Sequence, residues 1–417
     1  MEPEQNARQQ RGLVIAATAK IGKRDRGTWI VPSQSGDRKA RYAVTISKEG
    51  KFCTCPDFEL RQKPCKHVYA VQYVLFRETA TNGETTTVTE TAAVRVTYAQ
   101  NWPAYNAAQV GEKETFLNLL RDLCANVPEP EQTRGRPRLP LRDMIFSAAF
   151  KVYSTTSARR FMSDLRDAQG KGLIARAPHY NSLFRCLESD AVTPIIRDLV
   201  TRAALPLRAI ETEFAIDSTG FTSTQLVGLW QEEKYGAHKV RREHDWVKVH
   251  AVCGVKTNVI TAIEATEKNT QDSPFFAPLI TRTAEQFNVT RVMGDKAYSS
   301  YANLELTVAK GAEPFIPFKS YAVGTSPSHT WNKLFGFFML HREEFLKAYH
   351  KRSNVEATFS AIKRVFGDTV RSKTKTAQIN EVLLKALAHN IRCVIHAMAE
   401  LGISPSFWGS NESLGAR

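Results

Sequence analysis

A change in hydrophobic period near residue 211 constrains the fold of this chain more than any other feature. Before that point apolar residues recur at helical spacing, and after it they alternate as in β-strands. The expected strands are residues 213–216, 246–255, 259–265, 290–293 and 314–318, with a helix at 270–287 and a long helix after the fifth strand. This order predicts an α/β domain with a mixed sheet flanked by helices.

Acidic residues stand at the ends of two of these strands. Asp217 closes the first strand in Ile-Asp-Ser-Thr, and Asp295 closes the fourth in Gly-Asp-Lys-Ala-Tyr. Ligands of such sheets collect at strand ends, so the two aspartates are candidate metal ligands. The rival carboxylates are Asp245, which opens a strand, and Asp272, which opens a helix as an expected cap.

A third acid stands on the long helix among cationic side chains. The offsets from Tyr349 to Arg352, Glu356 and Lys363 are 3, 7 and 14 residues, which predicts that all four lie on one helical stripe. A carboxylate with these neighbours indicates a metal-binding acid beside groups that bind phosphate. Asp217, Asp295 and Glu356 together form the expected catalytic set.

Three of the seven cysteines cluster with a histidine near the N-terminus. Cys53, Cys55, Cys65 and His67 follow the spacing C-x-C, nine residues, C-x-H. Three thiolates and one imidazole form a closed tetrahedral set, which is typical of one structural zinc ion. The cluster resembles the SWIM zinc finger, a strand-strand-helix module, and a strand-like pattern at 40–46 and a helical pattern after His67 agree with it. The finger is expected to bind DNA or a protein.

Composition narrows the class of protein. The 417 residues carry a formal net charge of +15, and the sequence pI near 9.5 fits a polyanionic partner. No apolar run reaches the roughly 18 residues of a membrane span, and the polar N-terminus lacks the apolar stretch of a signal peptide. We therefore expect a cytoplasmic protein without a membrane partner, associated with the nucleoid in a prokaryotic host.

The middle of the chain supplies a linker and a basic helical region. Residues 79–90 are rich in Thr and nearly free of large apolar residues, and helices are expected from 112 onward. The segment containing Arg134, Arg136 and Arg138 is similar to an AT-hook, whose arginines enter the minor groove; an exposed basic loop explains it equally well. Helices at 157–167 and 180–188 fit either a helix-turn-helix or, better, a plain helical subdomain. The predicted organisation is a finger with a basic arm at 1–80, a linker at 81–111, a DNA-binding helical region at 112–208, a catalytic domain at 209–400 and a tail at 401–417.

The sequence as a whole resembles DDE transposases of bacterial insertion sequences, in the group with the signature Y-x2-R-x3-E-x6-K. Tyr349, Arg352, Glu356 and Lys363 match every signature position, and the resemblance covers roughly residues 138–397. It implies a ribonuclease H-like catalytic core with Asp217 as the first acid. Most such relatives have no SWIM-like finger, which leaves its recognition target open.

The resemblance implies DNA cleavage and strand transfer at the ends of a mobile element. Cleavage by water needs an activated nucleophile and charge stabilisation on the leaving oxygen, and two Mg²⁺ or Mn²⁺ ions held by Asp217, Asp295 and Glu356 supply both. Arg352 and Lys363 are expected to hold phosphates, and Tyr349 to contact a terminal nucleotide. The implied partners are the terminal inverted repeats, target DNA and a second copy of the chain in a dimer or larger assembly.

Two other functions remain open at this point. A ribonuclease H-like nuclease would share the acids but lack the cationic stripe, and a domesticated DNA-binding regulator would be expected to have lost an acid. The chain retains the stripe and all three acids.

Overall fold

The computed structural model describes residues 7–25, 27–33, 41–47, 50–81, 101–132, 135, 137–223 and 245–408. The chain forms two compact units. The first comprises Met1–Tyr98, Ser299–Glu305 and Ile316–Ala348, and the second comprises Ala99–Tyr298, Leu306–Phe315 and Tyr349–Arg417. Residues from the interval between Asp295 and Glu356 thus pack with the N-terminal region, whereas the sequence assigns that interval to the catalytic domain. The domain boundaries given above remain predictions.

The second unit is built on a six-stranded mixed sheet. Its strands follow the order β7-β6-β5-β8-β9, and β10 pairs with β5 beside this path. β5 pairs with β8 and β8 with β9 in parallel, while β5–β6 and β6–β7 are antiparallel. The bounds are β5 Glu213–Ser223, β6 Trp246–Gly254, β7 Ile260–Glu267, β8 Arg291–Gly294, β9 Glu313–Phe315 and β10 Thr369–Val370. This mixed sheet confirms the predicted α/β class.

Strand β5 is longer than the sequence predicts. Its parallel pairing with β8 ends at Ile216, opposite Gly294, but its antiparallel pairing with β6 continues to Thr222. The prediction that a strand ends at Asp217 is therefore wrong. The polar run after Asp217 has no apolar alternation, yet its backbone groups find partners in β6, and a backbone ladder does not depend on apolar side chains.

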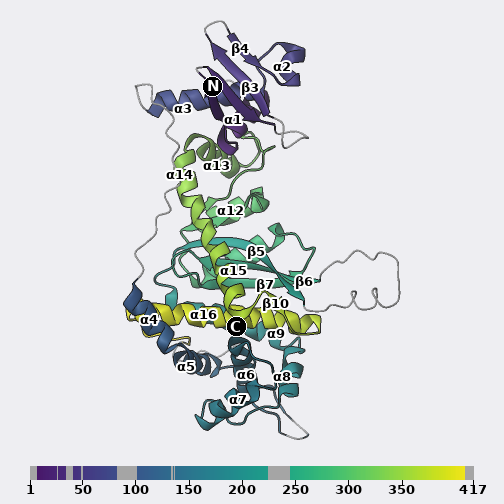
Figure 1. Cartoon of the computed structure of the whole chain (residues 1–417), viewed down its shortest axis with the longest axis vertical. Coiled ribbons are helices and arrows are strands. Elements are labelled where there is room, and N and C mark those ends of the chain that lie inside the picture. The colour runs from purple at the N-terminus through teal and green to yellow at the C-terminus, as the bar shows by residue number, and fades with distance from the viewer. Residues whose placement is uncertain are drawn as a thin grey trace, which may run out of the picture. The chain divides into compact units, whose positions relative to one another are not determined.

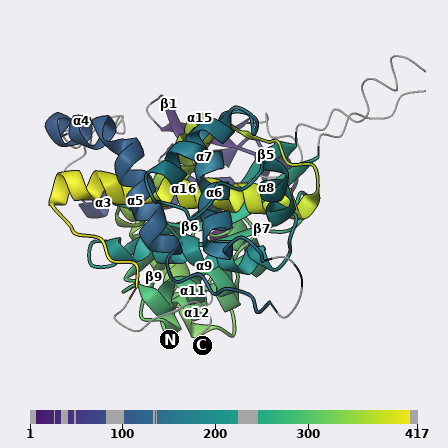
Figure 2. The ribbon, with the colours of Figure 1, turned by 90° about the horizontal axis from the view of Figure 1, so that it is seen from below.

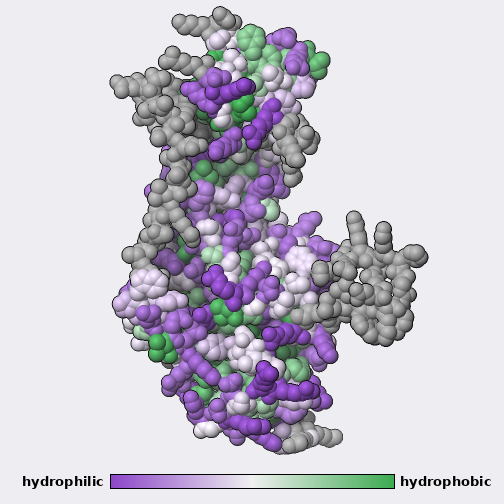
Figure 3. All heavy atoms as spheres, in the orientation of Figure 1, coloured by the Kyte–Doolittle hydropathy of each residue, from purple (hydrophilic) through white to green (hydrophobic). Residues whose placement is uncertain are grey.

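Helices surround this sheet, and the longest is α16, Lys375–Leu401. It packs against α9, α6, α4, α5 and β7 and crosses the middle of the second unit in Figure 2. The other helices are α4 Trp102–Val110, α5 Glu112–Cys124, α6 Leu141–Ser154, α7 Phe161–Gly170, α8 Tyr180–Leu187, α9 Val192–Ala204, η1 Leu205–Leu207, η2 Ser273–Phe275, α11 Phe276–Gln286, η3 Lys296–Tyr298, α12 Tyr301–Ala309, η4 His350–Arg352 and α15 Ser353–Phe366. By length and composition α16 could cross a membrane, but 72% of its most apolar window is buried inside the protein, as in the core helix of a soluble domain. Hydrophilic side chains dominate the face of the molecule in Figure 3.

Polar side chains fix α16 in this core. The side chain of Asn390 accepts a hydrogen bond from the Ile260 amide and donates to the carbonyls of Ile260 and Val200, so it joins the helix to β7 and α9. His389 Nε2 donates to the carbonyl of Asn258 at 2.9 Å. Because a buried polar group without a partner costs free energy, these bonds also fix the position of the helix along the sheet.

The first unit contains a four-stranded antiparallel sheet in the order β1-β2-β3-β4 (Figure 1). Its elements are α1 Ala7–Thr18, β1 Gly22–Asp25, β2 Thr28–Pro32, β3 Arg41–Ser47, β4 Gly50–Cys53, α2 Pro56–Arg61, α3 Lys66–Thr81, α13 His329–Leu340 and α14 Arg342–Tyr349, of which the last residue belongs to the second unit. α1 packs against α3, and buried residues of both helices form one core with Val31, Val44 and the three clustered cysteines.

The buried His389 makes stability depend on acid pH. Burial lowers its pKa from 6.5 to about 4, so the unfolded chain binds the proton more strongly between these values. Stability contributed by the neutral ring is present above pH 6.5 and is lost as the pH falls through 4. We expect His389→Gln to reduce the acid-induced loss of unfolding free energy by up to about 3 kcal/mol. Urea unfolding at pH 7 and pH 4.5 measures this, and the exposed His341→Gln should leave the difference unchanged.

Candidate catalytic and zinc sites

Strands β5 and β8 bring two of the predicted acids side by side. Ile216 and Gly294 are register partners in the parallel ladder, and Asp217 and Asp295 are the next residue on each strand. Each carboxylate accepts a backbone amide from its following residue, Ser218 N at 2.8 Å and Lys296 N at 2.5 Å. Because neighbouring strands lie about 4.8 Å apart, the two side chains emerge at one level of the sheet.

Arg352 joins the third acid to this pair. Its Nη1 lies 2.5 Å from Asp217 Oδ2, and its Nη2 lies 2.5 Å from Glu356 Oε1. Burial raises the pKa of Asp217, the Ser218 amide and the Arg352 charge oppose that rise, and Asp295 and Glu356 add to it. The three carboxylates therefore share one electrostatic neighbourhood, with the guanidinium between Asp217 and Glu356.

The segment that carries Arg352 and Glu356 is not one continuous α-helix. α14 ends at Tyr349, η4 forms a 3-10 turn, and α15 begins at Ser353. The prediction of one uninterrupted long helix is therefore wrong here. Lys351 and Arg352 in the turn pair with Glu213 and Asp217 of β5, and a 3-10 turn is a common adjustment at helix ends.

The other two signature residues remain near the acids. The guanidinium carbon of Arg352 lies 5.9 Å from the centre of the Tyr349 ring. Lys363 Nζ donates to Thr219 Oγ1 at 2.7 Å and lies 5.3 Å from the Phe221 ring. Asp217, Thr219 and Phe221 alternate along β5, so their side chains share the face that α15 covers.

Thr219 was not identified from the sequence. Its position two residues after Asp217, which puts both side chains on one face of a strand, could have indicated it. Sequence reasoning also missed the buried Tyr298, which lies three residues after Asp295 in the chain. Burial raises the pKa of the Tyr298 phenol, and Asp272, Asp217 and Asp295 add to that rise. This tyrosine is the last residue of the Gly-Asp-Lys-Ala-Tyr motif, and its closeness to Asp295 in the sequence could have indicated that it lies near the acids.

The rival carboxylates occupy structural positions. Asp272 makes no side-chain capping bond within the described residues, so its predicted role as a cap is wrong. Instead its Oδ1 lies 2.9 Å from Lys248 Nζ and 3.1 Å from Nδ1 of the fully buried His250. Asp245 lies 3.7 Å from Lys375 Nζ at the start of β6. Both aspartates are thus engaged with cations of the fold.

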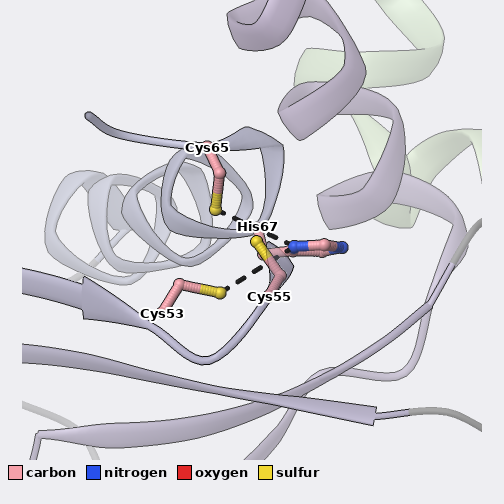
Figure 4. Close-up of side chains that lie close together, drawn as sticks. All are labelled: Cys53, Cys55, Cys65 and His67. Carbon is pink, nitrogen blue, oxygen red and sulfur yellow. Dashed lines mark hydrogen bonds between the residues drawn. The ribbon is translucent and has the colours of Figure 1, made fainter. Parts of the chain in front are cut away.

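The clustered cysteines and His67 converge in the first unit (Figure 4). Their four ligand atoms all lie within 4.8 Å of one another, and all four residues are buried. Cys53 ends β4, Cys55 precedes α2, and Cys65 and His67 stand at the start of α3. This arrangement fits the predicted zinc site.

The imidazole presents Nδ1 to the sulfur atoms. Nδ1 lies 3.9 Å from Cys53 Sγ and 3.8 Å from Cys65 Sγ. Hydrogen bonds from Cys53 and His67 lower the pKa of the Cys65 thiol, which favours the thiolate that binds metals. The ring also lies 4.8 Å from Tyr42, so β3 helps to orient it.

The remaining DNA-contact predictions are only partly described. Arg134 and Arg136 lie outside the described residues, whereas Arg138 is exposed before α6 and its amide bonds to the Gln132 side chain. Helices α7 and α8 are both present, but nine residues connect them. A helix-turn-helix uses a turn of about three or four residues, so this spacing favours the plain helical subdomain.

Comparison with known proteins matches one family model to each of the two regions. Residues 209–391 match the family described as transposase DDE domain, and residues 42–75 match the SWIM zinc finger. A probable transposase for insertion sequence element ISA1214 from Archaeoglobus fulgidus is 24% identical over 216 residues, which are 52% of this chain and 63% of that relative. No solved structure matches the chain. The chain thus contains a segment that matches the transposase DDE domain and, near its N-terminus, a segment that matches the SWIM zinc finger.

The zinc site yields a direct test. We expect one tightly bound zinc per chain, lost in Cys65→Ser and in His67→Ala because each removes one of four ligands. Metal analysis of protein purified under reducing conditions measures it. Cys186→Ser, which changes a cysteine outside the cluster, should retain the full zinc content. Zinc-free wild-type protein would contradict the assignment.

Proposed function

We propose that this protein is a transposase that binds the ends of a mobile DNA element and catalyses strand cleavage and strand transfer. The observation that carries the proposal is the grouping of Asp217, Asp295 and Glu356 within the DDE domain, with Arg352 paired to both Asp217 and Glu356. The relative that supports it is named a probable transposase, and this chain spans 63% of its length.

The acid set fits divalent metal ions. Asp295 and Glu356 both raise the pKa of Asp217, which marks a concentration of negative charge, and the Arg352 guanidinium already provides a cation between two of the acids. Carboxylate oxygens without histidine suit Mg²⁺ or Mn²⁺. We propose that Asp217, Asp295 and Glu356 would together hold two such ions. Bound ions supply an activated water and charge stabilisation for the leaving 3′ oxygen.

Arg352 has a second role in this proposal. In the absence of DNA, the two terminal nitrogens of the Arg352 guanidinium pair with Asp217 and Glu356, and its positive charge offsets the repulsion between these carboxylates. When the acids are otherwise neutralised, the same planar group is free to hold a DNA phosphate through two parallel hydrogen bonds. Arg352 thereby exchanges one anionic partner for another as substrate binds.

Lys363 and Tyr349 extend the DNA contact along the same face. Lys363 is only partly exposed and donates to Thr219, and burial lowers its pKa, so a phosphate would be favoured as a counter-ion. Tyr349 is half-buried beside Arg352 and would contact a terminal nucleotide.

The proposed partners follow from this chemistry. They are the terminal inverted repeats of the element, its target DNA and a second copy of the chain on DNA. The formal charge of +15 supports association with DNA in the cytoplasm, at the nucleoid of a prokaryotic host. The finger and the exposed Arg138 are further candidate DNA contacts.

The alternatives are a nuclease of the same fold and a DNA-binding regulator derived from a transposase. The Tyr349, Arg352 and Lys363 set beside the acids favours the transposase over the nuclease, and the intact acid set favours an enzyme over the regulator. Strand transfer of a cleaved 3′ end into plasmid DNA separates transposase from nuclease.

Alanine substitution of each acid tests catalysis. Asp217→Ala, Asp295→Ala and Glu356→Ala should each lower Mg²⁺-dependent cleavage by at least about a thousandfold, because charge stabilisation at the reacting oxygens is lost. DNA affinity should change little, since the acids hold metal rather than DNA. Gel-based cleavage and fluorescence anisotropy measure the two quantities. A variant that still cleaves removes its residue from the catalytic set, and Asp198→Ala on α9 serves as the control.

The salt dependence of binding tests Lys363. Lys363→Ala should lower the slope of log affinity against log salt by about 0.9, the value of one phosphate contact on duplex DNA. The neighbouring Arg364→Ala removes the same charge from an exposed position of α15 and should change the slope less. Equal slopes in the wild type and Lys363→Ala would assign Lys363 a purely structural role.

A further inference from the structure

The chain segment that leads into Glu356 folds with the zinc finger. Residues Ile316–Ala348 belong to the first unit, and α13 packs against α1 within that unit. The segment has an aromatic core of its own, in which Phe318 lies 4.7 Å from Trp331 and Phe338 lies 4.8 Å from Phe345. Figure 1 shows α13 beside α1.

A charged hydrogen bond ties this segment to α1. Arg342 Nη1, at the start of α14, donates to the carbonyl of Ala16 at 2.6 Å. Ala16 lies in the last turn of α1, where carbonyls lack helical partners and the helix dipole is negative. Arg342 therefore caps the C-terminal end of α1 from a distant part of the sequence. It donates to a terminal carbonyl and places a positive charge at the negative end of the helix dipole.

α1 in turn depends on the zinc cluster. A Cβ at Gly12 of α1 would lie 2.5 Å from Tyr69 Cβ and 2.8 Å from the Lys66 carbonyl, so the backbones of α1 and α3 are in close contact. Ile15 and Ala16 belong to the same buried cluster as Cys53, Cys55 and Cys65. α3 begins with the Cys65–His67 pair, so its placement follows from the metal ligands.

We propose that the zinc-folded finger is the docking platform for α13–α14, and that Arg342 makes the placement of Arg352 and Glu356 depend on bound zinc. The second part of this proposal, which concerns Arg352 and Glu356, rests on the proposed function. Arg342 precedes Arg352 by ten residues and Glu356 by fourteen, with α14, η4 and α15 following one another without a loop. Loss of zinc removes the folding energy of the finger, and the Ala16 carbonyl then no longer holds α14 in place.

Hydrogen exchange of the full-length protein tests the docking. Removing zinc with a chelator should speed amide exchange in α13 and α14 by about tenfold or more, the effect of losing a charged hydrogen bond. Arg342→Ala should do the same while zinc remains bound, and Arg342→Lys, which keeps one donor, should restore part of the protection. The exposed Lys347→Ala on α14 is the matched control. Exchange in β6 and β7 should not change.

The effect of Arg342 on the catalytic acids is measured separately. In Arg342→Ala, exchange at the first turn of α15 should rise, and the Mg²⁺ concentration for half-maximal cleavage should rise about fivefold or more with DNA affinity unchanged. Unchanged exchange in α14 after zinc removal and in Arg342→Ala would overturn the docking. Faster exchange in α14 with an unchanged α15 would overturn the coupling. If the wild type fails to cleave DNA, the proposed function fails, and the exchange results still decide the inference.

Discussion

The backbone ladder of β5 is the constraint on which the site depends. β5 pairs with β6 on one side, with β8 on the other, and with β10 beyond the end of β8. The change of partner falls at Ile216, so Asp217 is the first residue that the parallel neighbour no longer covers. The same break leaves room at the end of β8 for Asp295. The continuous strand β5 thus holds Asp217 rigidly, and the end of β8 leaves the side chains of Asp217 and Asp295 accessible.

Electrostatics explains how three acids are tolerated in this position. Burial and the mutual repulsion of carboxylates raise the pKa of Asp217, and Arg352 opposes that rise by pairing with Asp217 and Glu356 together. Lys351 places a second cation on Glu213 of the same strand. The turn at η4 is therefore held to β5 by two ion pairs, and partly buried pairs of this kind are less screened by salt than surface pairs. The turn that interrupts the helix is thus bound to the sheet through two charged side chains.

Much of this arrangement was predictable from the sequence, because hydrophobic period reports directly on burial. Strands β5 to β9 and the convergence of Cys53, Cys65 and His67 were predicted from spacing, whereas the short strand β10 was not. The extension of β5 did not follow, since residues 217–223 are held by backbone pairing that leaves no side-chain pattern. The bridge through Arg352 was missed for another reason. Sequence spacing placed Arg352 near Glu356, but only the tertiary fold brings its second nitrogen to Asp217.

The association of α13–α14 with the finger was equally hidden, and the reason is physical. Trp331, Phe335 and Phe338 of α13 pack around Phe318, and their helical spacing does not identify a partner helix. The contact that identifies α1 is a backbone carbonyl at a helix end, and every helix offers such carbonyls. The carbonyl of Ala16 is within reach of Arg342 because α3 holds α1 in place through the close contact at Gly12. Gly12 of α1 and Arg342 of α14 thus both contribute to the association of α13–α14 with the finger. A metal site that stabilises the N-terminal finger can in this way influence a segment that the sequence assigns to the catalytic domain.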